Sequence, residues 1–455
     1  MKSVNPANEE TLAEYAPLSP GERDIRIGES SSAYESWRRR PIAERAACLR
    51  RAAAHLREAK HELAKLVTQE MGKPIRQSEA EVEKSAVGCE YYAEHGESFV
   101  APQPLEFDGA RTYLRYDPIG PVLAVMPWNF PLWQVFRFAA PTLLAGNVAL
   151  LKHASNVSGC ALAIERIFRL AEFPPSTFTT LLIGSNEVAD VIAHPAVRAV
   201  TLTGSDAAGR SVSRVAGEHL KKTVLELGGS DPFIVLADAD VESTARAAAQ
   251  ARTLNSGQSC IAAKRFIVHE SIADAFAEAM VAEMRKLRVG DPLDSATDVG
   301  PLARADLRDD LHDQVERSVQ AGAKLLTGGR AIESPGFFYE PAVLDRVTMG
   351  MAAFDEETFG PVAAIIRASD DDEAIELANR SAFGLGASVW SRDVEHAERL
   401  TPRIDSGMVF VNEIVKSDPR LPFGGVKDSG YGRELSNIGI REFTNVKTVW
   451  VNNRA

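Results

Sequence analysis

The chain has 455 residues, of which 45% are hydrophobic and 25% charged, a balance typical of a globular protein with two or three domains. Its formal net charge of −12 argues against a nucleic-acid partner, which would favour a basic surface. The N-terminus has no apolar signal-peptide segment, and no apolar run is long enough to span a membrane. We therefore expect a soluble cytoplasmic protein.

The cysteines and histidines carry no metal-binding or disulfide pattern. The four cysteines, Cys48, Cys89, Cys160 and Cys260, are widely spaced, and the nine histidines form no HExxH or similar motif. This spacing argues against a disulfide framework and a zinc site, and it favours a reducing compartment. We expect no metal cofactor.

The first hundred residues are expected to be mainly helical. Between residues 43 and 70, apolar side chains recur at spacings of three, four or seven, which predicts one helix with an apolar face. Gly72 and Pro74 are expected to end this helix.

From Pro121 onward, strand and helix patterns alternate. The first series of predicted strands covers 122–126, 148–151, 178–183, 199–202 and 223–225. Buried strands joined by helices favour a parallel, doubly wound sheet of the nucleotide-binding type, whose ligands bind beyond the carboxyl ends of the strands.

A second α/β series follows, with Gly228-Gly229 as the expected hinge. Its predicted strands cover 233–236, 265–269, 363–366, 388–390 and 408–411. The β-rich segments 112–116 and 446–451 lie outside both series, and we expect them to pair with each other or with another subunit.

Two candidate catalytic groups lie 34 positions apart. Glu226 ends a predicted strand before Gly-Gly, and Cys260 follows the polar segment 255–259. A thiol on a loop can attack a carbonyl, and a carboxylate can activate a water. Taken alone, each residue has a plainer interpretation, because a single cysteine is usually a small buried apolar residue and a Glu at a turn is usually solvated.

Three more polar segments directly follow predicted strands, at 127–131, 152–155 and 203–205. The last of these, Thr-Gly-Ser, precedes a predicted helix, whose free backbone N–H groups suit a phosphate. The glycine-rich fingerprint G-x-G-x-x-G of ordinary dinucleotide-binding domains is absent.

Six motifs in order resemble those of the aldehyde dehydrogenase superfamily: MPWNFP, LTGS, LELGGS, GQSC, EETFGPV and PFGGVKDSGYGRE. They cover nearly the whole chain and are most similar to short bacterial succinate-semialdehyde dehydrogenases. The resemblance implies an α/β fold with a doubly wound parallel-sheet cofactor domain, an α/β catalytic domain and a small β oligomerisation arm, in a homodimer or homotetramer. The implied boundaries are 1–100, 119–227 and 419–432 for the dinucleotide-binding domain, 228–418 for the catalytic domain, and 101–118 and 433–455 for the arm.

The resemblance also implies NAD(P)-dependent oxidation of an aldehyde to a carboxylic acid through a cysteine thiohemiacetal and a thioester. Cys260 matches the nucleophile, Asn129 the amide that binds the oxyanion, and Glu226 the base that activates water. The implied cofactor-binding residues are Met126, Pro127, Trp128, Lys152, Ser155, Gly204, Ser205, Leu227, Glu357 and Phe359.

The choice between NAD and NADP stays open. Ser155 lies three residues after Lys152, where relatives that prefer NAD often carry a Glu that repels the 2′-phosphate of NADP. No carboxylate occupies that position here.

Arg137, eight positions after Asn129, matches the arginine that binds the distal carboxylate in succinate-semialdehyde dehydrogenases, so succinate semialdehyde is the expected substrate. A second arginine of some relatives is replaced here by Leu254, and Lys416, Ser417 and Arg420 could compensate. Arg137 could instead form a salt bridge on a helix surface.

Three alternatives remain at this point. The first is an aldehyde dehydrogenase for another small aldehyde. The second is a cysteine esterase that needs no dinucleotide, although no histidine lies near Cys260 in sequence. The third is a non-catalytic protein that binds dinucleotide, against which the joint presence of Cys260, Glu226 and Asn129 argues.

Overall fold

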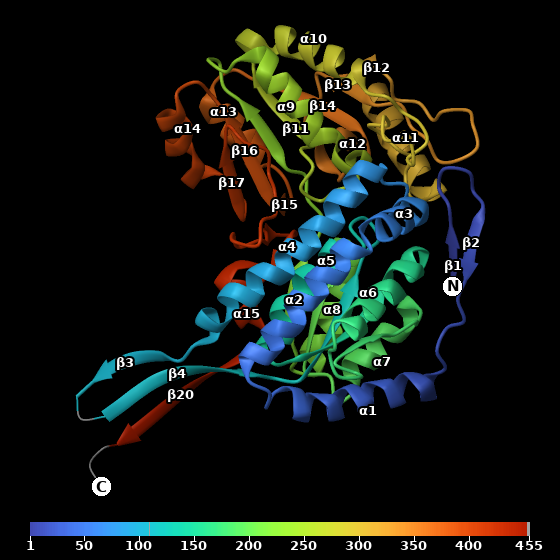
Figure 1. Ribbon diagram of the computed structural model, residues 1–455. Coiled ribbons are helices and arrows are strands. Elements are labelled where there is room, and N and C mark those ends of the chain that lie inside the picture. Colours follow the sequence, from blue (N-terminus) through green and yellow to red (C-terminus); the bar gives the residue numbers. More distant parts are fainter. Residues whose placement is uncertain (109, 453–455) are drawn as a thin grey trace.

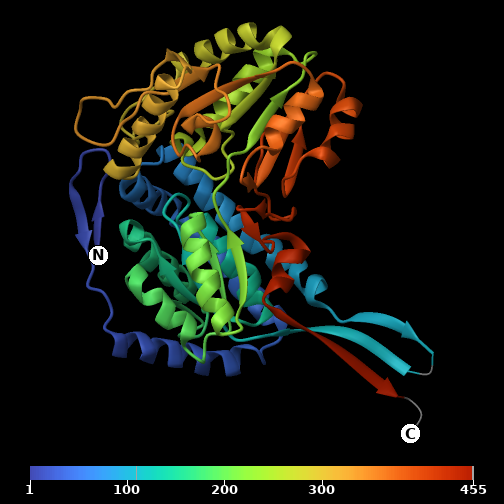
Figure 2. The ribbon, with the colours of Figure 1, turned by 180° about the vertical axis from the view of Figure 1, so that it is seen from behind.

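The computed structural model describes residues 1–108 and 110–452. It contains two α/β bodies, each built on its own sheet, and a three-stranded arm that projects from the lower body in Figure 1. Seen from behind, the chain passes from the lower sheet to the upper one in its middle third (Figure 2). The mixed α/β class expected from the sequence is confirmed.

The lower sheet has six strands in the order β19-β9-β8-β5-β6-β7. Their bounds are β5 (Pro121–Met126), β6 (Val148–His153), β7 (Phe178–Thr180), β8 (Ala199–Thr203), β9 (Lys222–Glu226) and β19 (Gly430–Tyr431). All neighbours pair in parallel except β19, which runs antiparallel to β9. The chain order reverses between β5 and β8, the position at which such sheets bind their ligands.

The upper sheet has seven strands in the order β12-β13-β14-β11-β10-β16-β17. They are β10 (Pro232–Val235), β11 (Arg265–His269), β12 (Lys324–Thr327), β13 (Ala342–Asp345), β14 (Val362–Ala368), β16 (Gly386–Trp390) and β17 (Met408–Val411). Only β12, at the edge, is antiparallel to its neighbour. The sequence did not predict β12 or β13. The break between the sheets, after β9, supports a hinge at Gly228-Gly229, and the domain boundaries remain a prediction.

Helices cover both sheets. They are α1 (Pro20–Trp37), α2 (Ile42–Glu58), α3 (Lys60–Met71), α4 (Ile75–Val100), α5 (Trp133–Ala145), α6 (Ser158–Leu170), α7 (Val188–Ala193), α8 (Asp206–Glu218), α9 (Val241–Thr253), α10 (Glu270–Lys286), α11 (Ala305–Gln320), α12 (Ala352–Asp355), α13 (Asp371–Asn379), α14 (Val394–Leu400) and α15 (Ser436–Glu442). Among the described residues, no helix is long and apolar enough to cross a lipid bilayer.

The first hundred residues are mainly helical, as expected, and one local expectation within them was wrong. The single helix expected over 43–70 is two helices, because Ala59 adopts a turn conformation between α2 and α3 (φ −92°, ψ 11°). Because the apolar spacing continues across this turn, the periodicity of the sequence does not reveal the break between the two helices. The first residues form a hairpin of β1 (Lys2–Val4) and β2 (Thr11–Glu14).

Helix α5 carries polar side chains into the centre of the molecule. Every residue of its sequence, WQVFRFAAPTLLA, is buried, because the helix is apolar on all sides and packs against α2 and α4. Gln134 and Arg137 are therefore held in the interior, next to the carboxyl ends of the lower strands.

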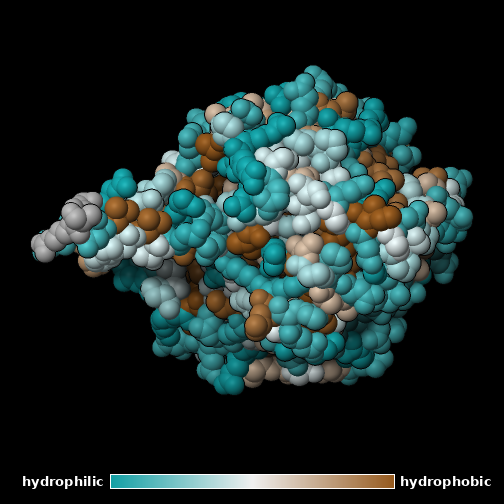
Figure 3. Space-filling view, turned by 90° about the horizontal axis from the view of Figure 1, so that it is seen from below, coloured by the Kyte–Doolittle hydropathy of each residue, from teal (hydrophilic) through white to brown (hydrophobic). Residues whose placement is uncertain are grey.

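The arm consists of β3 (Gln103–Phe107), β4 (Ala110–Pro118) and β20 (Thr444–Asn452), all antiparallel. Thr112 lies opposite Trp450, so the two β-rich segments pair with each other. Strand β20 is at the edge of this sheet, and hydrophobic residues lie exposed on the projecting arm (Figure 3).

Candidate active site

A cavity of about 370 Å³ lies beyond the carboxyl ends of β5, β8 and β9. Many of the residues expected to bind cofactor or substrate line it: Pro127, Trp128, Asn129, Gly204, Ser205, Leu227, Cys260, Glu357 and Phe359. Gln134, Arg304 and Leu307 line it as well, and the sequence did not single them out. The structure thus brings the predicted thiol, amide donor and phosphate turn to one cavity.

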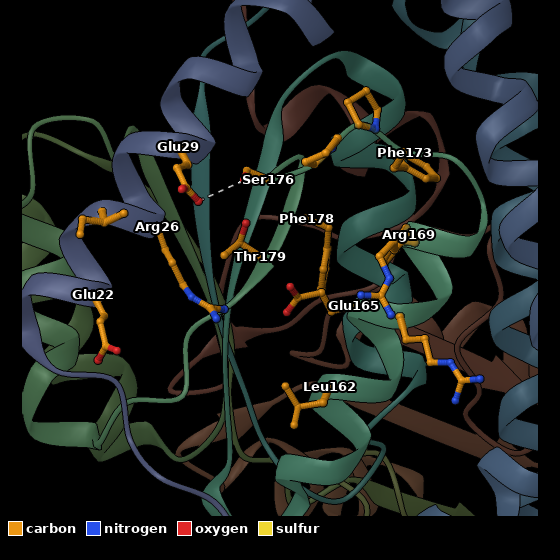
Figure 4. A pocket seen from close by; sticks show the side chains of 15 residues that line it. Glu22, Arg26, Glu29, Leu162, Glu165, Arg169, Phe173, Ser176, Phe178 and Thr179 are labelled. Atoms are coloured by element: carbon orange, nitrogen blue, oxygen red, sulfur yellow. Dashed lines mark hydrogen bonds between the residues drawn. The ribbon is translucent and has the colours of Figure 1, made fainter.

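A larger cavity, of about 750 Å³, lies between α1, α6 and the edge strand β7 and contains none of the predicted residues. Side chains from α1 and α6 face one another across it (Figure 4). Arg26 donates to the carbonyl oxygen of Thr180 (3.0 Å), and Glu165 accepts from its N–H (2.9 Å), so these side chains satisfy the open edge of β7.

The loop that carries Cys260 is fixed by one buried lysine. The Nζ atom of Lys264, at the start of β11, donates to the carbonyl oxygens of Ser259 (3.1 Å), Cys260 (3.0 Å) and Ala262 (3.2 Å). It also lies 3.6 Å from Oε1 of Glu357. These contacts hold the backbone of the candidate nucleophile in one conformation.

The segment before Cys260 adopts a tight, left-handed turn. Asn255 and Ser256 have φ values of 55° and 54°, which non-glycine residues rarely adopt. The side-chain amide of Asn255 donates to the carbonyl oxygens of Asn129 (2.8 Å) and Gln258 (3.0 Å). The turn is therefore tied directly to the segment that carries the candidate oxyanion donor.

The side-chain amide of Asn129 is held from both ends. Its Nδ2 donates to the carbonyl oxygen of Gln258 (3.0 Å), and its Oδ1 accepts from Nε2 of Gln134 (3.2 Å). An amide nitrogen has two hydrogens, so one N–H remains for an oxyanion in the cavity. Gln134 is the only glutamine in the largely apolar α5, and a polar residue at such a position is the sequence feature that indicates a role in the site.

The Cys260 thiol is partly exposed, while Cys48, Cys89 and Cys160 are buried. Burial raises the pKa of Cys260 to about 12, and the positive charges of Arg137 and Lys264 act in the opposite direction. At neutral pH this thiol is protonated, and a base must take its proton when it reacts.

The Glu226 carboxylate lies behind the wall of this cavity. Its neighbours Leu227 and Gly228 line the cavity, whereas its Oε1 faces Gly424, where a Cβ atom would be 2.7 Å away. Both of its oxygens are buried without a hydrogen-bond partner among the described residues. Desolvation first, and then the charge of Glu434, raise the pKa of Glu226 well above its ordinary value.

Arg137 is buried, with 4% of its surface exposed, so it is not the surface residue considered above. Its guanidinium group forms an ion pair with Glu434 and donates to Oγ1 of Thr203 (3.3 Å). It also lies over the ring of Phe423, 4.5 Å from the centroid. Arg137 is therefore already engaged, and it is not among the residues that line the cavity.

Of the three side chains on the loop before Pro422 that were expected to complete the substrate pocket, only one is buried. Ser417 is buried, whereas Lys416 is half exposed and pairs with Glu413. The side chain of Arg420 is 74% exposed and forms two hydrogen bonds with Asp418 (2.8 and 2.7 Å). Arg420 remains a prediction as a substrate residue, but this geometry gives it no support.

The residues expected to bind the dinucleotide follow the ends of β5, β6 and β8. Ser205 caps α8 by accepting from the N–H of Ala208 (3.3 Å), so the helix begins beside the Gly204-Ser205 turn and presents its positive end there. Lys152 is half-buried at the second-last position of β6, and Ser155 begins a short 3-10 helix, Ser155–Val157. Met126 is buried at the end of β5.

The opposite wall is formed by aromatic and acidic residues. The rings of Trp128 and Phe359 meet edge to face, with centroids 5.8 Å apart. Glu357 accepts from the N–H of Gly229 (2.9 Å). A Cβ atom on Gly228 would lie 2.7 Å from the Glu357 carboxylate, and one on Gly229 would lie 2.5 Å from the Cys260 carbonyl oxygen, so the Gly-Gly pair lets both segments approach.

The sequence profile described as the aldehyde dehydrogenase family matches residues 1–449. The chain belongs to the aldehyde dehydrogenase family. This aldehyde dehydrogenase is 49% identical to a succinate-semialdehyde dehydrogenase [NADP(+)] of Mycolicibacterium paratuberculosis, over 99% of this chain and 96% of that relative. It is 48% identical to a probable succinate-semialdehyde dehydrogenase [NADP(+)] of Synechocystis, over 99% of both chains.

Solved structures agree with this assignment. A succinic semialdehyde dehydrogenase from Streptococcus pyogenes in complex with NADP+ is 37% identical and superposes with a TM-score of 0.97, over 99% of this chain and 100% of that one. The family fold, with cofactor and catalytic domains, is thus confirmed. The residues around the cavity fit a dinucleotide, because the start of α8 offers free N–H groups to a pyrophosphate and no acidic residue occupies position 155.

Proposed function

We propose that this aldehyde dehydrogenase oxidises succinate semialdehyde to succinate with NAD or NADP. The observation that carries the proposal is the shared cavity of Cys260, Asn129 and the Gly204-Ser205 turn. The relatives named above support the choice of substrate.

In the first step, the Cys260 sulfur forms a bond to the aldehyde carbon as its thiol proton passes to a water molecule of the solvent. The carbonyl oxygen becomes an oxyanion, which the free N–H of Asn129 and the Cys260 backbone N–H stabilise. Because Lys264 holds the carbonyl oxygens of this loop, the backbone donor is already in place before the aldehyde binds.

The second step is oxidation. A dinucleotide held at the Gly204-Ser205 turn would supply the hydride acceptor for the thiohemiacetal carbon, so that Cys260 would be left carrying a thioester. Trp128, Phe359 and Glu357 surround the space beside the thiol and would orient this carbon and exclude water.

Glu226 acts in the third step. Its side chain must rotate away from Gly424 toward the cavity, where it takes a proton from the water that attacks the thioester carbon. The C–S bond then breaks, the acid leaves, and the thiol is restored. The raised pKa of Glu226 makes it a base that gains a proton readily.

No carboxylate would meet a 2′-phosphate at Ser155, so the site admits NADP as well as NAD. A Ser155→Glu variant should lose kcat/KM for NADP by about tenfold or more while NAD is less affected, since like charges in contact cost several kcal/mol. An equal loss with both dinucleotides would remove Ser155 from cofactor selection.

Steady-state kinetics with both dinucleotides test the proposal as a whole. The expected result is a higher kcat/KM for succinate semialdehyde than for butanal, a neutral aldehyde of the same length. Hydrolysis of an ester without dinucleotide, and no aldehyde oxidation, would instead favour the cysteine esterase. The residues that line the cavity include no histidine to serve such an esterase.

We further propose that the arm joins two copies of this chain into a homodimer or homotetramer in the cytoplasm. The edge strand β20 leaves backbone groups open for pairing, and Phe107, Val446 and Trp450 lie more than half exposed on the arm. The four unpaired cysteines support a reducing compartment. Sedimentation of the full chain measures its mass, and a monomer at micromolar concentration would contradict the assembly.

A further inference from the structure

Helices α4 and α5 and the loop before Pro422 bring together three side chains beside the active site. Nζ of Lys84 donates to Oγ of Ser417 (2.7 Å), and Nε1 of Trp133 donates to the same oxygen (2.9 Å). The Lys84 ammonium group also lies over the Trp133 ring, 4.5 Å from its centroid. The three residues come from separate segments, so no sequence motif joins them.

The ammonium group of Lys84 has no carboxylate partner within ion-pair distance in the described part of the chain. The nearby Glu81 pairs with Lys73 and accepts from the backbone N–H groups of Leu132 and Trp133 (2.9 and 3.0 Å). The nearby Asp418 is engaged by an exposed arginine. A mostly buried cation without a counter-ion is costly, which points to a ligand that supplies the negative charge.

The hydroxyl group of Ser417 is arranged to donate. Its oxygen already accepts two hydrogen bonds, and its own hydrogen has no acceptor among the described contacts. A hydroxyl in this situation can donate to an incoming acceptor. Together, Ser417 and Lys84 offer one O–H and one ammonium group to the same point.

This point is close to the chemistry. Arg137 lies one helical turn after Trp133 and therefore on the same face of α5. Gln134, the residue directly after Trp133, lines the cavity, and Arg137 donates to Oγ1 of Thr203 (3.3 Å), which lines it too. The guanidinium group of Arg137 pairs with Glu434, whereas Lys84 pairs with no carboxylate among the described residues.

We propose that Lys84 joins Ser417, which the family resemblance already places in the substrate pocket, in binding the distal carboxylate of the aldehyde against Trp133. This proposal rests on the proposed function and specifies how the substrate is chosen. Lys84 would take the place of the second arginine that is replaced by Leu254, a place that Lys416 and Arg420 do not fill because both face solvent and pair on their own loop.

The test is the kinetics of Lys84→Met on two substrates. For succinate semialdehyde, kcat/KM should fall roughly tenfold to a hundredfold, the effect of one charge-assisted contact, mainly through KM. For butanal, the change should stay within about threefold. Lys416→Met is the matched control and should change neither value, and Lys84→Arg should recover much of the loss.

The pH dependence gives a second readout. Burial, and then the charge of Arg137, lower the pKa of Lys84 to about 8, while Glu81 and Asp418 raise it and Lys73 lowers it. Because only the protonated amine attracts a carboxylate, kcat/KM for succinate semialdehyde should fall above about pH 8 relative to butanal. In Lys84→Met this difference between the substrates should vanish.

Two outcomes distinguish a failure of the role of Lys84 from a failure of the proposed enzyme activity. If the wild-type enzyme prefers succinate semialdehyde and Lys84→Met keeps that preference, Lys84 does not bind the carboxylate and the function stands. If the wild-type enzyme shows no preference, both proposals fail. Equal losses on both substrates would likewise overturn the role of Lys84, and the melting temperature shows whether the variant is folded.

Discussion

Two clusters of buried charge flank Cys260, and they differ in how completely their groups are paired. On the cofactor side, Lys264 contacts three carbonyl oxygens and Glu357, and Glu357 also accepts a backbone N–H. On the other side, Arg137 pairs with Glu434, and the carboxylate of Glu226 has no hydrogen-bond partner among the described residues.

The difference separates a fixed support from a group that exchanges protons. A buried polar network that is fully hydrogen-bonded is rigid, which suits a loop that must present a nucleophile and an oxyanion donor. Desolvation raises the pKa of both Glu226 and Glu434, the charge of Glu434 raises that of Glu226 further, and the charge of Arg137 lowers both. This incompletely paired cluster suits a base that must gain and lose a proton in each catalytic cycle.

The largest effect is expected from removing the cation of the fixed cluster. Lys264→Met leaves Glu357 and three carbonyl oxygens without their partner, and breaking such a buried pair costs roughly 3–5 kcal/mol of unfolding free energy. Urea denaturation measures the loss. Lys286→Met, which removes an exposed lysine paired with Glu283, should change stability by no more than about 0.5 kcal/mol.

A neutral donor between the clusters should matter less for stability than for rate. Asn129→Ala removes one oxyanion donor, so kcat should fall about 10²–10³-fold. In Gln134→Met, kcat should fall by only about fivefold, because this variant loses one hydrogen bond to the Asn129 amide but keeps the oxyanion donor. If Gln134→Met were as damaging as Asn129→Ala, Gln134 would act directly on the substrate.

The smallest effect is expected in the pH profile of the second cluster. Glu434→Gln removes a negative charge that raises the pKa of Glu226, so the pKa of Glu226 should fall. Because Glu226 acts in its deprotonated form, the rise of kcat with pH should move to lower pH. A profile that stays in place or moves to higher pH would show that the two carboxylates do not interact.

Much of the site could be predicted from the sequence because its motifs are local. The strand-end segments and the loop of Cys260 each place their residues at the carboxyl edge of the lower sheet, and the structure brings Cys260, Asn129 and Ser205 to one cavity. The pairing of Arg137 with Glu434 could not be predicted, because 297 positions separate them and only the packing of α5 brings them together.

Other features depend on contacts that leave no local pattern. Lys84 stands among charged residues in α4, where a lysine is ordinarily solvated, and only the position of Ser417 gives it a partner. The turn at Ala59 interrupts a continuous apolar spacing, and β12 is short and half exposed, so both escape periodicity.

The division of labour around Cys260 is tested most directly by rapid mixing of Glu226→Gln with succinate semialdehyde and NADP. The expected result is a burst of one NADPH per subunit, followed by steady-state turnover at least about a hundredfold slower than in the wild-type enzyme, because the thioester forms but is not hydrolysed. Cys260→Ala should give no burst. Full steady-state turnover by Glu226→Gln would contradict the assignment of Glu226 as the base.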